Sequence, residues 1–251
     1  MSDALNDIIK RHIAQHGPMD VGQFMNVALC HPEHGYYMKQ DPFGKDGDFT
    51  TAPEISQMFG EVIGAWVADL WLQMGSPTPF GLVECGPGRG TLMKDIMRAT
   101  EKVPDFHASA ILHLIEISPT LKTVQGTVLE DYPVHWHQSL GAVPTSYPLI
   151  ILGNEFFDAL PFRQLVKATE GWAECVVTEE LSFGLRPAGA ELISQIPEHL
   201  QDEKDGAVLE LSPVRSAAME NICDLLQQAG WAGLFLDYGY AKSATGDSFQ
   251  A

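Results

Sequence analysis

Three glycines at alternate positions form the most distinctive chemical pattern of the chain. They are Gly86, Gly88 and Gly90, and Glu84 stands two residues before the first of them. Glycine lets a backbone turn sharply and approach a ligand closely, because it has no Cβ. The segment follows the apolar run Leu82–Cys85 and opens a helical pattern, and a helix N-terminus favours a negatively charged group. The loop therefore predicts a site for an anionic part of a small molecule.

A second acidic residue stands where the next apolar run ends. Glu116 follows Ile111–Ile115 and lies 32 residues after Glu84. An acid at this place can accept hydrogen bonds from both ribose hydroxyls of a nucleotide cofactor. A dinucleotide loop requires glycine where this chain has Thr91. The spacing acid-x-Gly-x-Gly-x-Gly is instead that of the loop that cradles the amino-acid half of S-adenosylmethionine (SAM), so we expect SAM as the cofactor.

A third polar cluster follows the apolar run Leu149–Leu152. Asn154, Glu155 and Asp158 come after it, and ligands of open α/β sheets bind outside the carboxyl ends of the strands. Carboxylates there can grip a cationic acceptor. Glu155 and Asp158 are therefore our candidate catalytic residues, and Asn154 is a candidate cofactor contact. A structural alternative stays open, in which Glu155 caps a helix and the neighbouring phenylalanines fill the core.

Residues 1–78 have the periodicity of helices. The clearest helical pattern runs from Thr51 to Gly75, where apolar residues recur for about five turns. Thr51-x-x-Glu54 has the spacing of a capping box at its start. A role in covering the cofactor is the alternative, and it makes Thr51 a candidate cofactor contact. We expect residues 1–78 to form an N-terminal helical cover.

From residue 79 onward, short apolar runs alternate with helical segments, as in a parallel sheet. Residues 79–251 are therefore predicted to form an α/β, Rossmann-like domain, with a β-rich insertion at about 162–206 that contains a hairpin around Glu170-Gly171. The expected strands are Leu82–Cys85, Ile111–Ile115, Pro133–Trp136, Leu149–Leu152, Ala207–Leu211 and Gly233–Leu236, and the expected helices are Thr91–Thr100, Leu121–Asp131 and Pro213–Ala229.

Charge and composition narrow the classes of partner. The chain has 15 Lys+Arg against 33 Asp+Glu, a net charge of −18, which argues against nucleic acid or an anionic membrane as the main partner. No stretch approaches the ~18 apolar residues of a membrane span, and the N-terminus has no apolar leader. The four cysteines form no C-x-x-C pair. We expect a cytoplasmic protein without membrane insertion.

Two histidine-containing segments have the look of metal ligands. Cys30-His31-x-x-His34 is one, and His135-x-His137, whose side chains share a face of a strand, is the other. Neither segment has a third or fourth ligand in evident register. We therefore expect no metal site.

Several segments together resemble the MidA-like family, which includes the mitochondrial complex I assembly factor with arginine methyltransferase activity. The segments are residues 47–61, 84–92, 113–119, 154–161 and Asp237-Tyr238-Gly239. The resemblance implies a class I SAM-dependent methyltransferase fold and a protein acceptor, such as a respiratory complex subunit, methylated on arginine. Family members continue past the last motif. We therefore expect the final strands to be missing and Gly233–Leu236 to lie at an unfinished side of the sheet.

Two other functions stay open beside a SAM-dependent protein arginine methyltransferase. One is a non-catalytic assembly or chaperone factor that keeps the SAM-binding fold, against which the intact glycines and Glu116 speak. The other is a nucleotide-dependent oxidoreductase, against which Thr91 in place of a third loop glycine counts.

Overall fold

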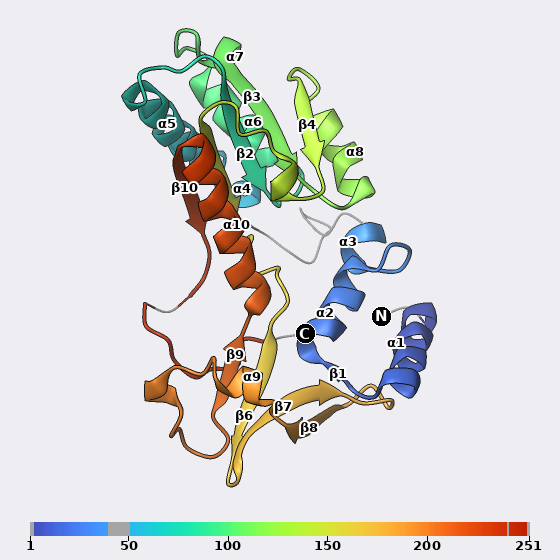
Figure 1. The fold of residues 1–251 in the computed structure, drawn as a ribbon. Helices are drawn as coiled ribbons and strands as arrows, with labels where there is room; N and C mark the ends of the chain where they lie inside the picture. Colours follow the sequence, from blue (N-terminus) through green and yellow to red (C-terminus); the bar gives the residue numbers. More distant parts are fainter. Residues whose placement is uncertain (1–2, 40–50, 240, 250–251) are drawn as a thin grey trace. The chain divides into compact units, whose positions relative to one another are not determined.

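The chain folds as two compact units (Figure 1). The computed structural model describes residues 3–39, 51–239 and 241–249. Unit 1 consists of Met1–Tyr36, Leu160–Ala217 and Tyr238–Ala251, and unit 2 of Tyr37–Ala159 and Ala218–Asp237. This division differs from the expected boundary at residue 78, because the first helices pair with the β-rich insertion while residues 51–78 pack on the parallel sheet.

Among the described residues, unit 2 is built on a five-stranded sheet in the order β10-β5-β2-β3-β4. All four pairings are parallel. Every residue of the central strand β2 is buried, which explains why it has an apolar run without alternation. The expected strands are confirmed to within a few residues. The bounds are β2 Phe80–Cys85, β3 Ala110–Ile115, β4 Val134–His137, β5 Leu149–Asn154 and β10 Trp231–Leu236.

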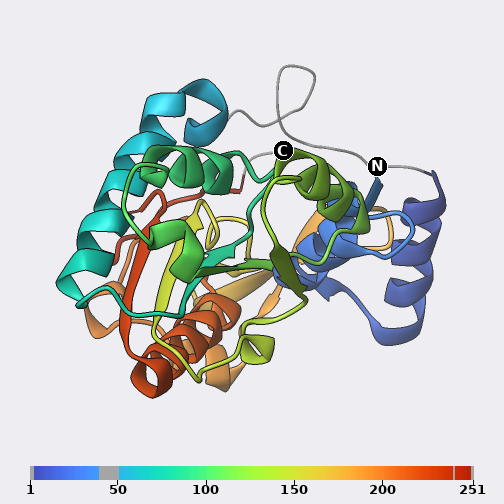
Figure 2. The same ribbon diagram turned by 90° about the horizontal axis from the view of Figure 1, so that it is seen from above.

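Helices cover both faces of this sheet (Figure 2). On one face α5 (Gln57–Gln73) and α6 (Thr91–Thr100) pack over the alternate strand residues Leu82, Leu112 and Leu152. On the other face Ile222 and Leu225 of α10 (Pro213–Ala229) pack over Val83 and Ile151. The remaining elements of this unit are α3 Tyr36–Lys39, α7 Phe106–Ser109, α8 Pro119–Val128 and η1 Leu140–Ala142.

The predicted helix from Thr51 to Gly75 is interrupted. A short helix, α4 (Ala52–Ile55), ends before Ser56, whose extended backbone (φ −145°, ψ 115°) separates it from α5. The predicted capping box is wrong, because Thr51 occupies the cap position of α4 without a side-chain cap hydrogen bond. The carboxylate of Glu54 instead contacts residues of the glycine loop, described below. The break leaves α4 free to take a direction different from that of α5.

Unit 1 contains the β-rich insertion together with the first helices. Its sheet has the order β1-β7-β6-β9, with β8 paired to β7, and every pairing is antiparallel. The predicted hairpin is confirmed between Ala168 and Gly171, and Asp20 caps α2 as part of a capping box with Gln23. The bounds are α1 Asp3–His16, β1 Met19–Asp20, α2 Val21–Cys30, β6 Arg163–Ala168, β7 Gly171–Val177, β8 Phe183–Pro187, α9 Ala190–Ile193, η2 Glu198–Leu200 and β9 Val208–Leu211.

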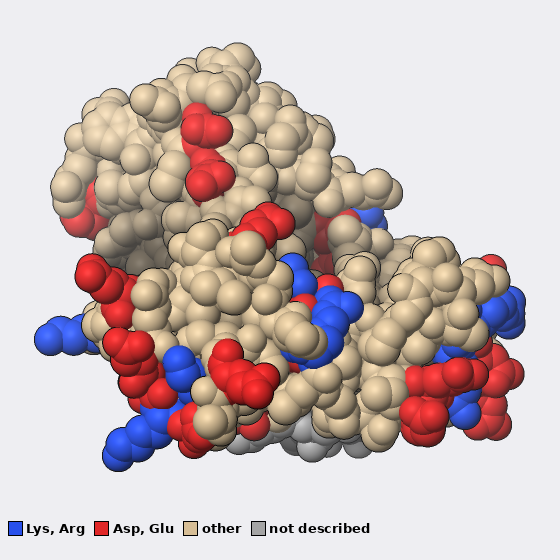
Figure 3. Space-filling model, turned by 60° about the horizontal axis from the view of Figure 1, so that its bottom comes forward, with Lys and Arg blue, Asp and Glu red and all other residues tan. Residues whose placement is uncertain are grey.

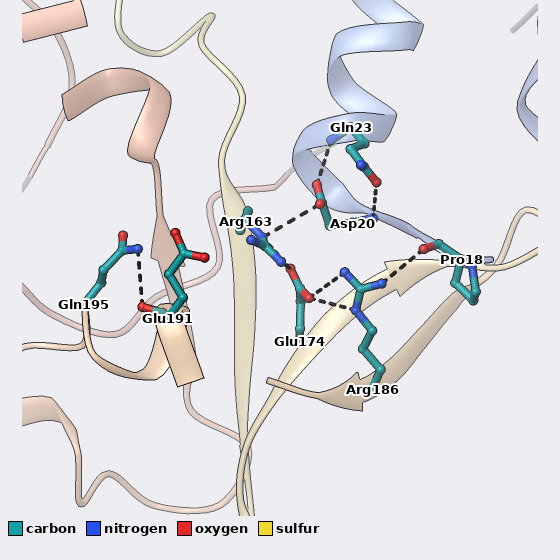
Figure 4. Close-up of polar contacts among 8 residues, drawn as sticks. All are labelled: Pro18, Asp20, Gln23, Arg163, Glu174, Arg186, Glu191 and Gln195. Carbon is teal, nitrogen blue, oxygen red and sulfur yellow. Dashed lines mark hydrogen bonds and ion pairs between the residues drawn. The ribbon is translucent and has the colours of Figure 1, made fainter. Parts of the chain in front are cut away.

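A buried ionic cluster joins three strands of unit 1 (Figure 4). Glu174 on β7 is only 1% exposed. One of its oxygens pairs with Arg163 on β6 at 2.5 Å, and the other pairs with Arg186 on β8 at 2.8 Å. Asp20 lies 3.8 Å from Arg163. Because each carboxylate oxygen has a cationic partner, the cost of burying the charge is offset.

Strand β10 forms one side of the parallel sheet. It pairs with β5, and no second neighbour occurs among the described strands. Trp231, its first residue, is 52% exposed. The prediction that Gly233–Leu236 lies at a side of the sheet is therefore confirmed. No helix within the described ranges is long and apolar enough to cross a membrane.

Charged side chains of both signs share the face shown in Figure 3. Lys and Arg lie among Asp and Glu there, without gathering into one broad basic surface. A continuous positive stripe is the usual footprint of nucleic-acid binding. The visible face has no such footprint.

Candidate cofactor and acceptor site

The glycine loop has a backbone that other residues adopt only with strain. Gly86, Gly88 and Gly90 have φ angles of 62°, 52° and 86°, in the left-handed region that favours glycine. The loop joins β2 to α6, with Gly90 at the N-cap position of the helix. The amide of Gly86 donates to the carbonyl of Ile115 on β3 (3.2 Å). The loop is thus held at the carboxyl end of the sheet, with the α6 N-terminus beside it.

Glu84 is buried directly before this loop. It is 2% exposed, and burial raises the pKa of its carboxyl group to about 8. The backbone N–H of Met93 in α6 donates to it. Among the described residues, its Oε2 atom has no hydrogen-bond partner. A buried carboxyl oxygen without a partner fits a cofactor that carries an ammonium group, as the amino-acid half of SAM does.

Glu116 directly follows β3, and hydrogen bonds hold its carboxylate in place. Its Oε1 accepts from the backbone N–H of Ser118 (2.7 Å), and its Oε2 accepts from Nε2 of Gln125 (3.0 Å). The backbone N–H of Ile117 donates to the carboxylate as well. A carboxylate offers about four acceptor positions, so one remains for a ribose hydroxyl. Burial raises the pKa of Glu116 despite these hydrogen bonds. The residue therefore fits the ribose role expected from the sequence.

Gln125 is a site residue that the sequence interpretation missed. From α8 its amide nitrogen donates to Gly88 O at 2.7 Å as well as to Glu116, and its Oε1 accepts from Trp136 Nε1 at 2.9 Å. It is fully buried and connects the glycine loop to the second acidic residue. The available signal was a glutamine on the face of α8 that faces the core. Residue spacing alone does not show which groups such a side chain would contact.

Glu155 follows β5 in a left-handed conformation with φ 55°. Its backbone N–H donates to the carbonyl of Leu236 on β10 (2.7 Å). Its carboxylate accepts from the Asn154 side chain and from the backbone N–H of Ala52 in α4, and burial raises its pKa. The negative charges of Asp158 and Asp237 raise that pKa further.

Asp158 is exposed and lies in a turn rather than in a helix. The structural alternative for Glu155 as a helix cap lacks its helix for the same reason. The alternative holds for Phe156 and Phe157, which pack against the core over β5. The N–H groups of Phe157 and Asp158 both donate to Asp237, which the sequence interpretation had not placed in the site.

Helix α4 contacts both the glycine loop and the Glu155 turn. Glu54 accepts from the Thr91 hydroxyl at 2.5 Å, and its other oxygen lies 3.6 Å from Nη1 of Arg89. Ala52 donates its N–H to Glu155. Thr51 precedes Ala52 and is half-buried. Glu84, Glu116, Asn154, Glu155 and the three glycines therefore share the carboxyl end of one sheet, with Thr51 at the start of α4 above it.

The ring of His113 is hydrogen-bonded through both of its nitrogens. His113 Nδ1 lies 2.9 Å from His137 Nε2, and His113 Nε2 lies 2.9 Å from the Tyr147 hydroxyl. Burial, with two neighbouring histidines, lowers the pKa of His113 to about 4. In the part of the chain that the structure describes, no group of three His, Cys, Asp or Glu side chains could hold a metal ion.

Known proteins are similar to this chain in sequence and in fold. A model of S-adenosyl-L-methionine-dependent methyltransferases matches residues 62–251. The mitochondrial protein arginine methyltransferase NDUFAF7 homolog of Drosophila melanogaster is 34% identical over 272 residues, covering 97% of this chain and 62% of that protein. Human NDUFAF7, named as the mitochondrial protein arginine methyltransferase, is 32% identical over 264 residues, covering 93% and 58%. This chain thus spans about three-fifths of the length of these curated relatives.

Two crystal structures from Burkholderia thailandensis have the same fold. One contains S-adenosyl-homocysteine; it has a TM-score of 0.76 and 24% identity, with coverage of 95% of this chain and 63% of that chain. The other is a native structure with a TM-score of 0.74 and 25% identity, covering 96% and 62%.

The relatives also correct one prediction. The expectation of a cytoplasmic protein is contradicted, because the curated relatives are named as mitochondrial proteins. The composition of the first residues was a poor guide to compartment. The recognition of a SAM-dependent methyltransferase fold from the glycine loop and Glu116 is confirmed. The matched model covers well over half of the sequence, and the chain therefore belongs to the S-adenosyl-L-methionine-dependent methyltransferase family.

Proposed function

We propose that this chain transfers a methyl group from SAM to arginine side chains of a protein acceptor. One observation carries the proposal, the adjacency of the glycine loop and the Glu155 turn. Cys85 pairs with Gly153 in the parallel register of β2 and β5, so the two loops leave neighbouring strands at the same edge. The names of the curated relatives support arginine as the acceptor residue.

The cofactor half of this site consists of residues that bind and orient. SAM supplies an electrophilic methyl group on a sulfonium ion. The glycine loop and the α6 N-terminus would hold its amino-acid carboxylate, and Glu84 its ammonium group. Glu116 would accept from a ribose hydroxyl. Asn154 and Thr51 stay proposed contacts, because each precedes a residue at the site, Glu155 and Ala52.

The acceptor half is acidic, as a guanidinium group requires. Arginine stays charged near neutral pH, and a carboxylate beside it can fix its plane and concentrate its charge away from the attacking nitrogen. Glu155 would hold the guanidinium and take up the proton released after transfer. The raised pKa of Glu155 supports that step. Asp158, exposed at the same turn, would contact the guanidinium from the solvent side.

The protein acceptor that the family resemblance favours is a subunit of a respiratory complex. The chain itself contributes the strongly acidic composition, with a net charge of −18. Such a charge attracts a basic acceptor over a Debye length of about 8 Å at physiological ionic strength. We place cofactor and acceptor chemistry in unit 2, because every site residue named above belongs to it.

The test is the identity of the methylated product. The full chain, isotope-labelled SAM and a mitochondrial protein extract are incubated together, and the proteins are hydrolysed to amino acids. We expect label in methylarginine. Glu155→Gln should leave SAM affinity nearly unchanged and reduce turnover at least ~100-fold, the scale of one lost electrostatic stabiliser.

The matched control is Glu61→Gln on α5. Glu61 also pairs with an arginine, Arg98 on α6 at 3.3 Å, but this pair is exposed and away from the loop. It should keep wild-type turnover. Label in another amino acid, or normal turnover of Glu155→Gln, would contradict the proposal.

A further inference from the structure

The last residue of β10, Leu236, and the residue after it, Asp237, hold the turn that carries Glu155. Asp237 Oδ1 accepts from the backbone N–H groups of Phe157 and Asp158, both at 3.1 Å. These partners are 80 and 79 residues away along the chain. The preceding residue, Leu236, accepts from the N–H of Glu155 at 2.7 Å. Three backbone N–H groups of the turn, those of Glu155, Phe157 and Asp158, therefore donate to the two residues Leu236 and Asp237.

The turn requires such support because of its backbone. Glu155 has φ 55°, and a residue other than glycine in this region costs on the order of 1–3 kcal/mol. A strained conformation persists only where neighbouring contacts determine it. The β10 anchors supply those contacts, and none of them comes from the turn itself. The Asn154 side chain and the backbone N–H of Ala52 donate to the Glu155 carboxylate and fix its position.

We propose that Asp237 is a positioning residue for methyl transfer, which keeps Glu155 directed at the acceptor by holding the amides of Phe157 and Asp158. This inference rests on the proposed function. A carboxylate suits the task, because charged acceptors form shorter and stronger bonds to N–H groups than neutral ones. Glycine at position 155 would relieve the backbone strain but would remove the carboxylate. The proposed role of Glu155 therefore requires that the strained backbone be kept.

Asp237 also acts on Glu155 through its charge. The groups that face Glu155 are Asp158 on its own turn, Asp237 directly after β10, and the donors Asn154 and Ala52. The two carboxylates raise the pKa of Glu155, and the two donors lower it. Neutralising Asp237 should therefore lower the pKa of Glu155, and the acidic limb of the pH–rate profile should move to lower pH.

Hydrogen exchange of the full chain tests the contact. Asp237→Ala removes the shared acceptor, and the amides of Phe157 and Asp158 should exchange about 10-fold faster, the effect of losing a net hydrogen bond. Asp237→Asn keeps an acceptor oxygen and should retain most of the protection. Asp224→Ala on α10 is the matched control, since Asp224 is exposed in the same unit, and it should change neither amide.

Titration of the Glu155 carboxyl by carbon NMR tests the electrostatic link. Its pKa should fall in Asp237→Asn and stay unchanged in Asp224→Asn. With labelled SAM and the mitochondrial extract, Asp237→Ala should lower turnover at least ~10-fold with SAM affinity within about twofold of wild type. The pKa change reports that the two carboxylates face each other, and loss of turnover at unchanged SAM affinity distinguishes positioning of Glu155 from general destabilisation of the fold.

Two results would overturn the inference. One is unchanged exchange of both amides together with an unchanged pKa of Glu155 in folded variants. The other is an Asp237→Asn variant that does not fold, which would make Asp237 a residue of the fold alone. If wild type forms no methylarginine, the proposed function fails, while exchange and titration still report whether Asp237 holds the turn.

Discussion

Replacing Glu84 by Gln tests whether burial raises the pKa of the carboxyl group directly before the glycine loop. Burial raises the pKa of Glu84 from 4.5 to about 8, whereas the unfolded chain has the ordinary value. As pH rises above 4.5 the unfolded state loses this proton and the folded state keeps it. Wild-type stability should therefore fall between pH 4.5 and about 8, and this contribution should be constant above that window.

The size of the effect follows from the pKa values. pH 7 is about 2.5 units above the pKa of Glu84 in the unfolded chain, and each unit corresponds to about 1.4 kcal/mol of free energy. Ionisation of Glu84 should thus cost about 3 kcal/mol of folding free energy at pH 7. Gln has nearly the same shape and no charge, so Glu84→Gln should lack this pH dependence. The new amide group forms hydrogen bonds of its own, which change the unfolding free energy by the same amount at every pH. The decisive quantity is therefore the change of the unfolding free energy with pH.

The assay is urea unfolding of wild type and Glu84→Gln at several values between pH 4.5 and 8.5. The stability difference, variant minus wild type, should rise by about 3 kcal/mol from pH 4.5 to 7. Glu61→Gln, which changes an exposed carboxylate, should give a nearly constant difference. Parallel stability curves for wild type and Glu84→Gln would refute the assignment of a raised pKa to Glu84.

Other substitutions probe the loop, the histidines and unit 1. Gly88→Val should abolish SAM binding, because φ at Gly88 is 52° and a β-branched residue is strained there; unchanged affinity by calorimetry of a folded variant would contradict the loop assignment. The pKa of His113 is lowered to about 4, so protonation opposes folding. Stability should decline as pH drops from 6.5 towards 4, by at most about 3 kcal/mol, and urea unfolding of His113→Gln should lack that slope. Glu174→Ala leaves two arginines without their shared carboxylate and should lower the unfolding free energy by about 3–5 kcal/mol, whereas thermal unfolding of Glu170→Ala, in the exposed hairpin turn, should be nearly normal.

The parallel sheet was predictable because its signals are local. Each strand is a short apolar run, and each loop after a strand has its own polar or glycine signal. The helix Thr91–Thr100 even has the expected bounds. The positions of Glu84, Glu116 and Glu155 were predictable for the same reason, since a residue at the carboxyl end of a strand is placed by the strand alone; their roles in binding and catalysis stay predictions.

The parts that escaped prediction depend on contacts between distant segments. Two-residue strand β1 has no periodicity of its own and exists through pairing with β7. The capping motif at Thr51 was misleading, because Glu54 accepts a hydrogen bond from Thr91 and Thr51 makes no side-chain cap bond. Asp237 joins the site through amides about 80 residues earlier. None of these partners can be read from spacing.

The pairing of β1 with β7 has a consequence for synthesis of the chain on the ribosome. Met19 meets Val177, and the same apolar cluster includes Leu5, Ile9 and Ile13 of α1. At about 5–20 residues per second, the partner strand is translated roughly 8–30 s after Met19. During that interval α2 can pack beside the apolar stripe of α1, but the cover that β7 provides is missing. A holdase chaperone that binds such stripes would therefore meet this chain from its first helix, and slowing elongation before β7 should lengthen that encounter.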